Sequence, residues 1–148
     1  MENRRTIVLK GIAVSPGIAF GKVYLLDHSE VQTPVYNLEQ PSQIVSEIKR
    51  FRLAVKKSRE QLLEIKKSLS EREIEPFFIL DVHLLILKDK TLLNTTIDNI
   101  RNRKANAEWA LKMTLDRYRD MFSKIEDSYL KERISDVQYV CERILRNL

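Results

Sequence analysis

Hydrophobic and polar residues follow two different periods along the chain. In residues 6–26, β-branched residues lie on both sides of Ser15-Pro16-Gly17, which predicts a strand, a tight turn and a second strand. After residue 41 the apolar spacing lengthens to about 3.6 residues, the period of an α-helix. The pattern therefore predicts a mainly α protein: a helical-hairpin bundle of about four to five helices with an N-terminal pair of β-strands.

A long helix is predicted from residue 42 to residue 69. Its apolar positions form one seam in which Ser58 is the only polar member. The seam consists of Ile44, Ile48, Phe51, Val55, Leu62, Ile65 and Leu69. A seam of about four heptads can pair with a second copy of the chain or with helices of the same chain. Because shorter helices follow, we expect an intramolecular partner and a long antiparallel hairpin.

The next predicted helix is apolar on more than one face. It should begin near Glu75-Pro76, because proline is tolerated in the first turn of a helix. One face carries Phe77, Leu80, Leu84 and Leu87, and a neighbouring face carries Ile79, His83 and Ile86. A surface helix needs only one apolar face, so this helix either packs on two sides or presents a patch to a partner.

Three more helical stretches follow. Residues 89–91 should interrupt the second helix before a short successor, and Asn106 can cap the helix after that. The final helix, residues 128–148, repeats the apolar seam and carries the single cysteine, Cys141, as an expected buried side chain. This helical pattern reaches the last residue without a cap, so we expect the chain to be a piece of a longer protein.

Composition favours an ordered protein of a reducing compartment. Hydrophobic residues make up 43% of the 148 residues and charged residues 32%, which is typical of a globular domain. No apolar run approaches the roughly 18 residues of a membrane span, and the N-terminus lacks a signal-peptide pattern. A single cysteine allows no intramolecular disulfide. We expect a cytoplasmic protein that does not bind membranes.

The net charge of +5 is unevenly distributed. Residues 42–70 contain eight Lys and Arg against three Glu, whereas residues 70–100 contain six acidic residues against three basic ones. A basic helix is most often a solvated surface, and no aromatic stacking platform accompanies this one. We therefore expect no nucleic-acid partner, although a basic nucleic-acid binder stays open as a third hypothesis.

No self-contained active site is evident. His28 and His83 are far apart and no His/Cys cluster has metal-ligand spacing, so no metal site is predicted. The glycine-containing segment lacks the lysine and hydroxyl partner of a P-loop, and no GxSxG motif is present. His83 keeps three open roles: a catalytic group, a partly buried side chain, or a recognition residue. Catalysis is disfavoured because Asp81 points to another side of the helix and a mid-helix position offers no free N–H groups.

Four stretches, in this order, resemble a known family. They are GIAVSPGIAFGKVYLL (11–26), HLLILKD (83–89), NAEWAL (106–111) and DSYLKERISDVQYVCERILRNL (127–148). Together they resemble the N-terminal region of Enzyme I of the phosphoenolpyruvate:sugar phosphotransferase system, over nearly the whole chain. Enzyme I moves phosphate from phosphoenolpyruvate onto a histidine and passes it to a histidine of the small carrier HPr.

The resemblance implies a domain division and a docking role. Residues 1–27 would be a β corner of an incomplete phosphohistidine α/β domain, residues 28–41 a linker, and residues 42–148 a helical HPr-docking domain. The phosphohistidine and the phosphoenolpyruvate site, with its Mg²⁺, would lie outside this chain, so no catalytic residue and no cofactor is expected in it. Partner-binding residues would be Ile79, His83, Ile86, Asp89 and Leu92. The chain alone should dock HPr but not catalyse transfer.

Two expectations qualify this interpretation. The family commonly has an acidic run after the apolar stripe, whereas Lys88, Lys90 and Thr91 surround Asp89 here, so the charge of the partner can differ too. An alternative function, from another class, is a stand-alone helical module for protein interaction or dimerisation. As a part of Enzyme I, the chain would also have the missing C-terminal domains of the same enzyme as partners, and a second copy could bind through exposed strands or helices.

Overall fold

Five helices account for most of the described part of the chain. The computed structural model describes residues 33–69, 74–127 and 133–148, with a few isolated positions before residue 23. The helices are α1 (Pro41–Ser68), α2 (Ile74–Ile86), α3 (Lys90–Arg103), α4 (Ala107–Ser123) and α6 (Ile134–Asn147). The prediction of a mainly helical bundle is confirmed. The predicted strand pair falls largely outside the described residues, and the described residues contain no strand beyond one isolated bridge.

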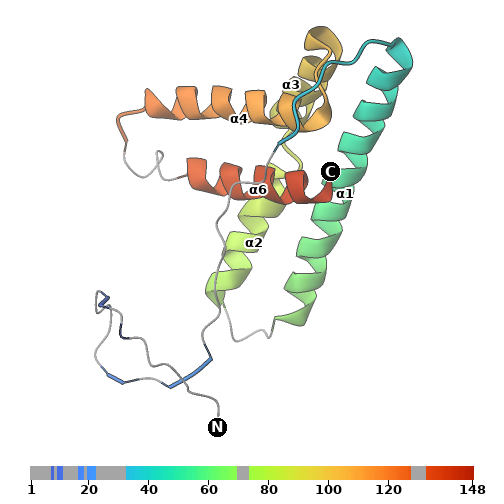
Figure 1. The fold of residues 1–148 in the computed structure, drawn as a ribbon. Coiled ribbons are helices and arrows are strands. Elements are labelled where there is room, and N and C mark those ends of the chain that lie inside the picture. Colours follow the sequence, from blue (N-terminus) through green and yellow to red (C-terminus); the bar gives the residue numbers. More distant parts are fainter. Residues whose placement is uncertain are drawn as a thin grey trace.

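The long helix α1 forms one side of the bundle, and the other helices pack against it. It contacts α2, α3, α4 and α6, and α4 packs in turn against α3 and α6. Figure 1 shows α4 and α6 lying side by side, with the C-terminal end of α6 against α1. The apolar seam of α1 therefore has the intramolecular partners that the sequence predicts.

The seam of α1 is at least partly buried at all but one of its predicted positions. Ile48, Phe51 and Leu62 are in the core, together with Ala54 between them. Ile65 is an exception, because 40% of it is exposed. Burying a Leu- or Phe-sized side chain contributes about 1.5–3 kcal/mol, so this seam supplies much of the stability of the bundle.

Ser58, the polar member of the seam, is completely buried at the crossing of α1 and α6. Its hydroxyl donates to the Ala54 carbonyl at 2.8 Å and accepts from Nδ2 of Asn147 at 2.9 Å. Asn147 also exchanges hydrogen bonds with Gln61, one turn along α1. A buried hydroxyl is tolerated when it is hydrogen-bonded, so a polar break in the apolar pattern marks a specific helix contact.

Residues 36–38 are irregular but are tied to the turn between α3 and α4. The Leu38 amide donates to the Lys104 carbonyl at 2.7 Å, and the Asn106 amide donates to the Tyr36 carbonyl at 3.2 Å. Lys104 adopts a left-handed φ of 51°, which ends α3 and turns the chain into α4. Part of the expected linker is thus fixed against the helical body.

Asn106 occupies the expected N-cap position of α4, but its side chain makes no cap hydrogen bond. Its Nδ2 donates to the Pro34 carbonyl and to Glu108, and its Oδ1 accepts from the Tyr36 amide. The amide of Ala107, in the first turn of α4, donates instead to Oε2 of Glu47 on α1 at 2.7 Å. A carboxylate suits this place because the N-terminus of a helix carries a partial positive charge.

Arg50 of α1 connects this turn with the end of α6. Its guanidinium donates to Glu47 at 3.0 and 2.7 Å, and to Glu108 at 2.7 and 2.6 Å. It also donates to the Leu148 carbonyl at 3.0 Å. Burial alone would raise the pKa of Glu108, but the Arg50 hydrogen bonds, together with the Asn106 contact, lower it. The planar fork of arginine makes such a paired contact possible, which a lysine cannot reproduce.

We expect Arg50→Met to lower the free energy of unfolding by about 1.5–3 kcal/mol, because Glu47 and Glu108 would stay largely buried without their cation. Lys56→Met is the matched control on the same helix: the Lys56–Glu60 pair is exposed, with 3.8 Å between its charged atoms, and should contribute under about 0.5 kcal/mol. Urea denaturation monitored by circular dichroism measures both. Equal small losses in the two variants would contradict a structural role of the Arg50 contacts.

The Arg50 contacts also make stability depend on pH. Because the pKa of Glu108 is lower in the folded than in the unfolded protein, its contribution is present above the ordinary Glu pKa of about 4.3 and is lost as pH falls below it. Between about pH 5 and pH 3 we therefore expect the parent protein to lose more stability than Arg50→Met does. Parallel loss in both proteins would exclude Glu108 as a source of the acid sensitivity.

Candidate functional site

Three large hydrophobic side chains of α2 are exposed to solvent. Phe78 is 67% exposed, Ile79 54% and Leu85 70%. Phe78 and Leu85 are seven residues apart and so lie on the same side of the helix, with Val82 between them and Ile79 adjacent. We call Phe78, Ile79, Val82 and Leu85 the α2 face. A contiguous apolar patch of this kind is uncommon on a protein surface unless something binds to it.

The opposite side of α2 holds the helix in place. Leu84 and Leu87 are buried in the core, Leu80 packs against it, and α2 contacts α1 and α6. An ion pair between Asp81 and Lys66 of α1 borders the α2 face. The α2 face therefore lies on a helix that is fixed from behind, so that binding to it requires no ordering of the helix backbone.

The junction after α2 is held by Asp89. Its Oδ1 accepts from the Thr91 amide at 2.7 Å and caps α3, as the predicted interruption at residues 89–91 implies. Its Oδ2 accepts from the Tyr118 hydroxyl of α4 at 3.4 Å. Burial, followed by the charge of Asp89, raises the pKa of Tyr118 to about 12. Asp89 thus fixes the angle between α2 and α3, in addition to any contact with a partner.

His83 lies between α2 and α6 and is largely covered. Its side chain is 14% exposed, its ring is 6.4 Å from that of Tyr139, and its Nε2 is 3.9 Å from Oδ1 of Asp136. That distance is too long for a hydrogen bond, and Nε2 is buried with no partner among the described residues. Burial lowers the pKa of His83, and the charge of Asp136 only partly opposes this.

The five residues expected to bind a partner are not equally exposed. Ile79 is on the α2 face, whereas His83, Ile86 and Asp89 are only partly accessible. Leu92 is 1% exposed and belongs to the core, so we expect it to support the surface from beneath. Sequence reasoning missed Phe78 and Leu85 as site residues. The sequence feature that could have identified them is the apolar character of more than one face of α2. Only one face of a helix can pack on the core, so large apolar side chains on the others stay exposed.

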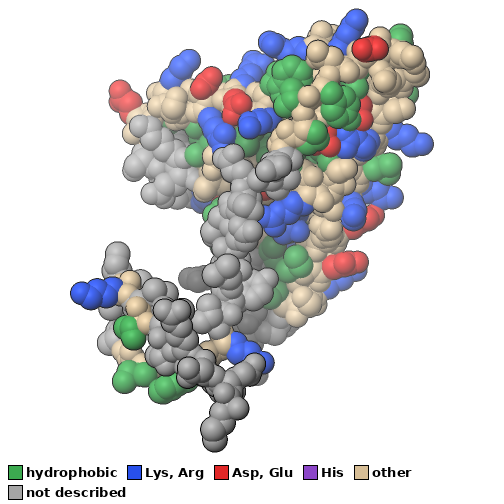
Figure 2. All heavy atoms as spheres, in the orientation of Figure 1, with side chains coloured by type: hydrophobic (Ala, Val, Ile, Leu, Met, Phe, Trp, Pro, Cys, Tyr) green, Lys and Arg blue, Asp and Glu red, His purple; other side chains and the backbone are tan. Residues whose placement is uncertain are grey.

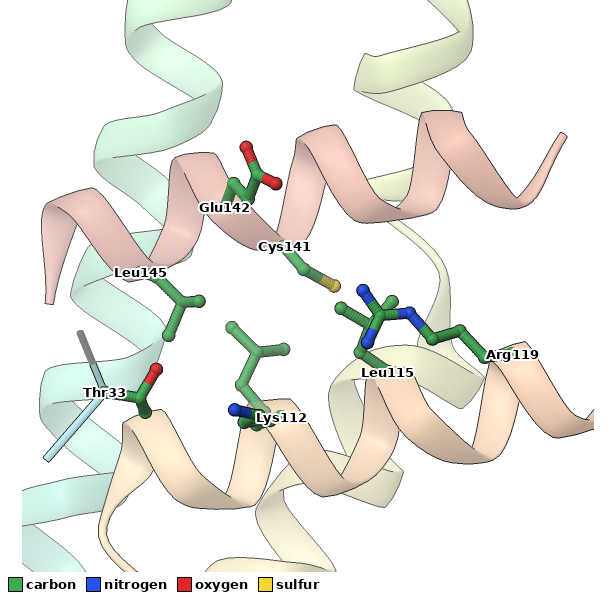
Figure 3. Close-up of a pocket in the computed structure, with 8 residues that line it drawn as sticks. Thr33, Lys112, Leu115, Arg119, Cys141, Glu142 and Leu145 are labelled. Atoms are coloured by element: carbon green, nitrogen blue, oxygen red, sulfur yellow. The ribbon is translucent and has the colours of Figure 1, made fainter. Parts of the chain in front are cut away.

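A cavity between α4 and α6 is too small for an ordinary ligand and is lined by no reactive thiol. Its volume is about 60 Å³, well below that of an ordinary ligand site of about 300 Å³ or more. Figure 3 shows the Sγ of Cys141 pointing toward the guanidinium of Arg119 across this cavity. Burial nevertheless raises the pKa of the Cys141 thiol to about 12, so the thiol stays protonated and unreactive near neutral pH. Cys141 is a core side chain, as expected.

The structure also bears on metal binding and membrane insertion. Within residues 33–69, 74–127 and 133–148, no group of three His, Cys, Asp or Glu side chains is arranged to hold a metal ion. None of the helices described is both long enough and apolar enough to span a membrane.

The burial of His83 predicts how its protonation and the stability of the fold depend on pH. Because burial lowers its pKa in the folded state, the unfolded chain binds more protons just below the ordinary pKa of about 6.5. The contribution of neutral His83 to stability is then complete above about pH 6.5 and decreases as pH falls below it. In an NMR titration we expect the His83 ring to titrate below 6.5, with His83→Gln used to assign its signals. A midpoint above 6.5 would show that the attraction of Asp136 outweighs burial.

Comparison with known proteins places the chain in a family. The family described as "PEP-utilising enzyme, N-terminal" matches residues 10–133. The phosphoenolpyruvate-protein phosphotransferase of Listeria innocua is 38% identical over 144 residues, which cover 95% of this chain and 24% of that protein. That of Bacillus subtilis is 36% identical over 141 residues, with the same coverage of 95% and 24%. This chain therefore spans about a quarter of the length of these relatives.

Solved structures agree with this assignment. The solution structure titled Enzyme I (nEIt) superimposes with a TM-score of 0.81 at 33% identity, covering 95% of this chain and 56% of that one. The structure titled N-terminal domain of Enzyme 1 - Nitrogen shares the fold, with a TM-score of 0.65 at 23% identity over 76% of this chain and 47% of that one. As its resemblance to Enzyme I implies, the chain belongs to the PEP-utilising enzyme N-terminal family and corresponds to the N-terminal part of the phosphoenolpyruvate-protein phosphotransferases.

Proposed function

We propose that this chain is the carrier-docking part of a phosphoenolpyruvate-protein phosphotransferase and that its α2 face binds an HPr-like phosphocarrier. The observation that carries this proposal is the exposure of Phe78, Ile79 and Leu85 on one fixed helix. We infer the reaction from the names of the relatives, and we infer HPr as the carrier from the resemblance to Enzyme I. Docking brings the carrier close to a phosphoryl donor held elsewhere in the enzyme.

The α2 face has the features of a binding hot spot. Large apolar side chains near the centre of an interface contribute most of its energy, and polar groups around them exclude water and set orientation. Phe78 and Leu85 would insert into an apolar patch of the carrier, with Ile79 beside them. The Asp81–Lys66 pair lies at the edge and would contribute little to affinity by itself.

His83 and Asp89 would act mainly by positioning. His83 is mostly covered by α6, and Asp89 already uses both oxygens within the protein. Neither side chain is accessible and oriented so that it could act as a nucleophile or a general base. We therefore assign the phosphoryl transfer to parts of the enzyme that correspond to the remaining three quarters or so of its relatives.

The charge at the edge of the site constrains the partner. Lys88 and Lys90 are exposed around the junction of α2 and α3, whereas Asp89 is committed to capping. Charged edges influence the association rate and the choice of partner more than the final affinity. We therefore expect the carrier that binds this chain to present fewer cations opposite the junction. A carrier that binds a relative with acidic residues at this junction would present more.

Binding can be tested by NMR titration of isotope-labelled, unphosphorylated HPr from the same organism with this chain. We expect localised shifts around the phosphorylatable histidine of HPr, lost in Ile79→Asp and in Leu85→Asp, because each places a charge at the centre of the apolar contact. Leu53→Asp is the control: Leu53 is 56% exposed on α1, away from α2, and its substitution should leave the shifts unchanged.

Two outcomes would count against this function. Equal weakening by Leu53→Asp would mean that the α2 face is not the specific site. Concentration-dependent dimerisation of the chain, abolished by Leu85→Asp and accompanied by no shifts of HPr, would support the alternative of a helical dimerisation module. Analytical ultracentrifugation of the chain alone supplies the second measurement.

A further inference from the structure

A groove between α1 and α3 is lined by both apolar and basic side chains. Its volume is about 480 Å³. The apolar side chains include Val45, Ile48 and Leu53, and the basic ones are Lys49, Arg52 and Lys56 of α1 and Arg101 of α3. None of these residues belongs to the α2 face. The space-filling view shows Lys and Arg side chains along the outer edge of α1, with hydrophobic side chains among them (Figure 2).

The apolar part of this groove is exposed where α1 has no helix to cover it. Val45 is 68% exposed and Leu53 56%, although both belong to a helix whose opposite face is in the core. Their spacing of eight residues places them on one side of α1. Over residues 45–56 the groove extends about 16 Å along the helix, which corresponds to three turns. That length matches a short helix lying alongside.

Three of the four cations that line the groove are not neutralised within the described part of the chain. Lys49, Arg52 and Arg101 form no ion pair with the described residues, whereas Arg50, next to them in sequence, is held by two carboxylates. Lys56 lies near Glu60 at 3.8 Å, an exposed pair of little energetic consequence. The groove therefore presents a positive field among exposed apolar side chains.

We propose that this groove binds an acidic amphipathic helix of a partner protein. Apolar side chains of that helix would contact Val45 and Leu53, and its carboxylates would face Lys49, Arg52 and Arg101. A second copy of the chain is a poor occupant, because a two-fold contact through this groove would place its cations opposite identical cations. Nucleic acid is also disfavoured, because none of the residues that line the groove is an aromatic that could stack on a base.

The test uses the whole chain, isotope-labelled, and a synthetic helical peptide of about four turns with Leu on one face and Glu on both sides of it. We expect amide shifts in residues 45–56 and near residue 101. Arg52→Glu should weaken the affinity at least about tenfold. Lys57→Glu, an exposed position on α1 outside the groove, changes the net charge equally and should have no effect. Thermal unfolding of each variant establishes that it is folded.

Three results would overturn the proposal. A peptide with Gln in place of Glu could bind equally well, which would remove the charge complementarity. The shifts could fall on α2 and disappear in Ile79→Asp, which would mean that the peptide uses the α2 face. A short DNA duplex could displace the peptide with no effect of Val45→Ser, which would favour a polyanion site. Since Ile79→Asp should leave peptide binding at the groove intact, failure here and failure of HPr docking are distinguishable.

Discussion

The contacts of Arg50 hold together segments that are distant in the sequence. One guanidinium on α1 bonds Glu47, Glu108 at the start of α4, and the carbonyl of Leu148 after α6. Glu47 in turn accepts from the first turn of α4, and Asn106 ties the segment before α1 to the same place. Desolvated charges are tolerated in the bundle because each has a partner with good geometry. The apolar contacts supply more energy, but they do not specify which helix end meets which.

This constraint leaves α2 in an unusual position. Hydrogen bonds fix the ends of α4 and α6 on α1 and the end of α3 on the segment just before α1, so the bundle does not require α2 to cover a further face. Its buried side, with Leu84 and Leu80, serves the core, as does Leu87 just after it. Phe78 and Leu85 therefore stay exposed on a helix that cannot easily reorient. A preformed apolar surface binds at lower entropic cost than one that must be ordered first.

The sequence predicts helices better than it predicts their contacts. Apolar periodicity finds α1 within a residue of its observed start and end, and Asp89 marks the break between α2 and α3. Periodicity could not reveal that Asn106 bonds Pro34 instead of capping α4. The acceptor that takes the Ala107 amide in its place is Glu47, which is about sixty residues away in the sequence. The resemblance to Enzyme I in turn implied one partner surface that includes His83 and Leu92, although α6 largely covers the first and the core contains the second. Burial depends on which helices pack together, and local spacing carries no such information.

The two exposed faces differ in charge. The α2 face is apolar with few charges at its edge, whereas the groove of α1 and α3 is lined by four basic side chains among its apolar ones. An apolar contact depends weakly on ionic strength, whereas attraction to the groove is screened by salt over about 8–10 Å. Both faces lie on helices that the core holds in place, and Arg50 ties α1, which lines the groove, to the end of α6. The dependence of binding on salt therefore distinguishes the two proposed contacts.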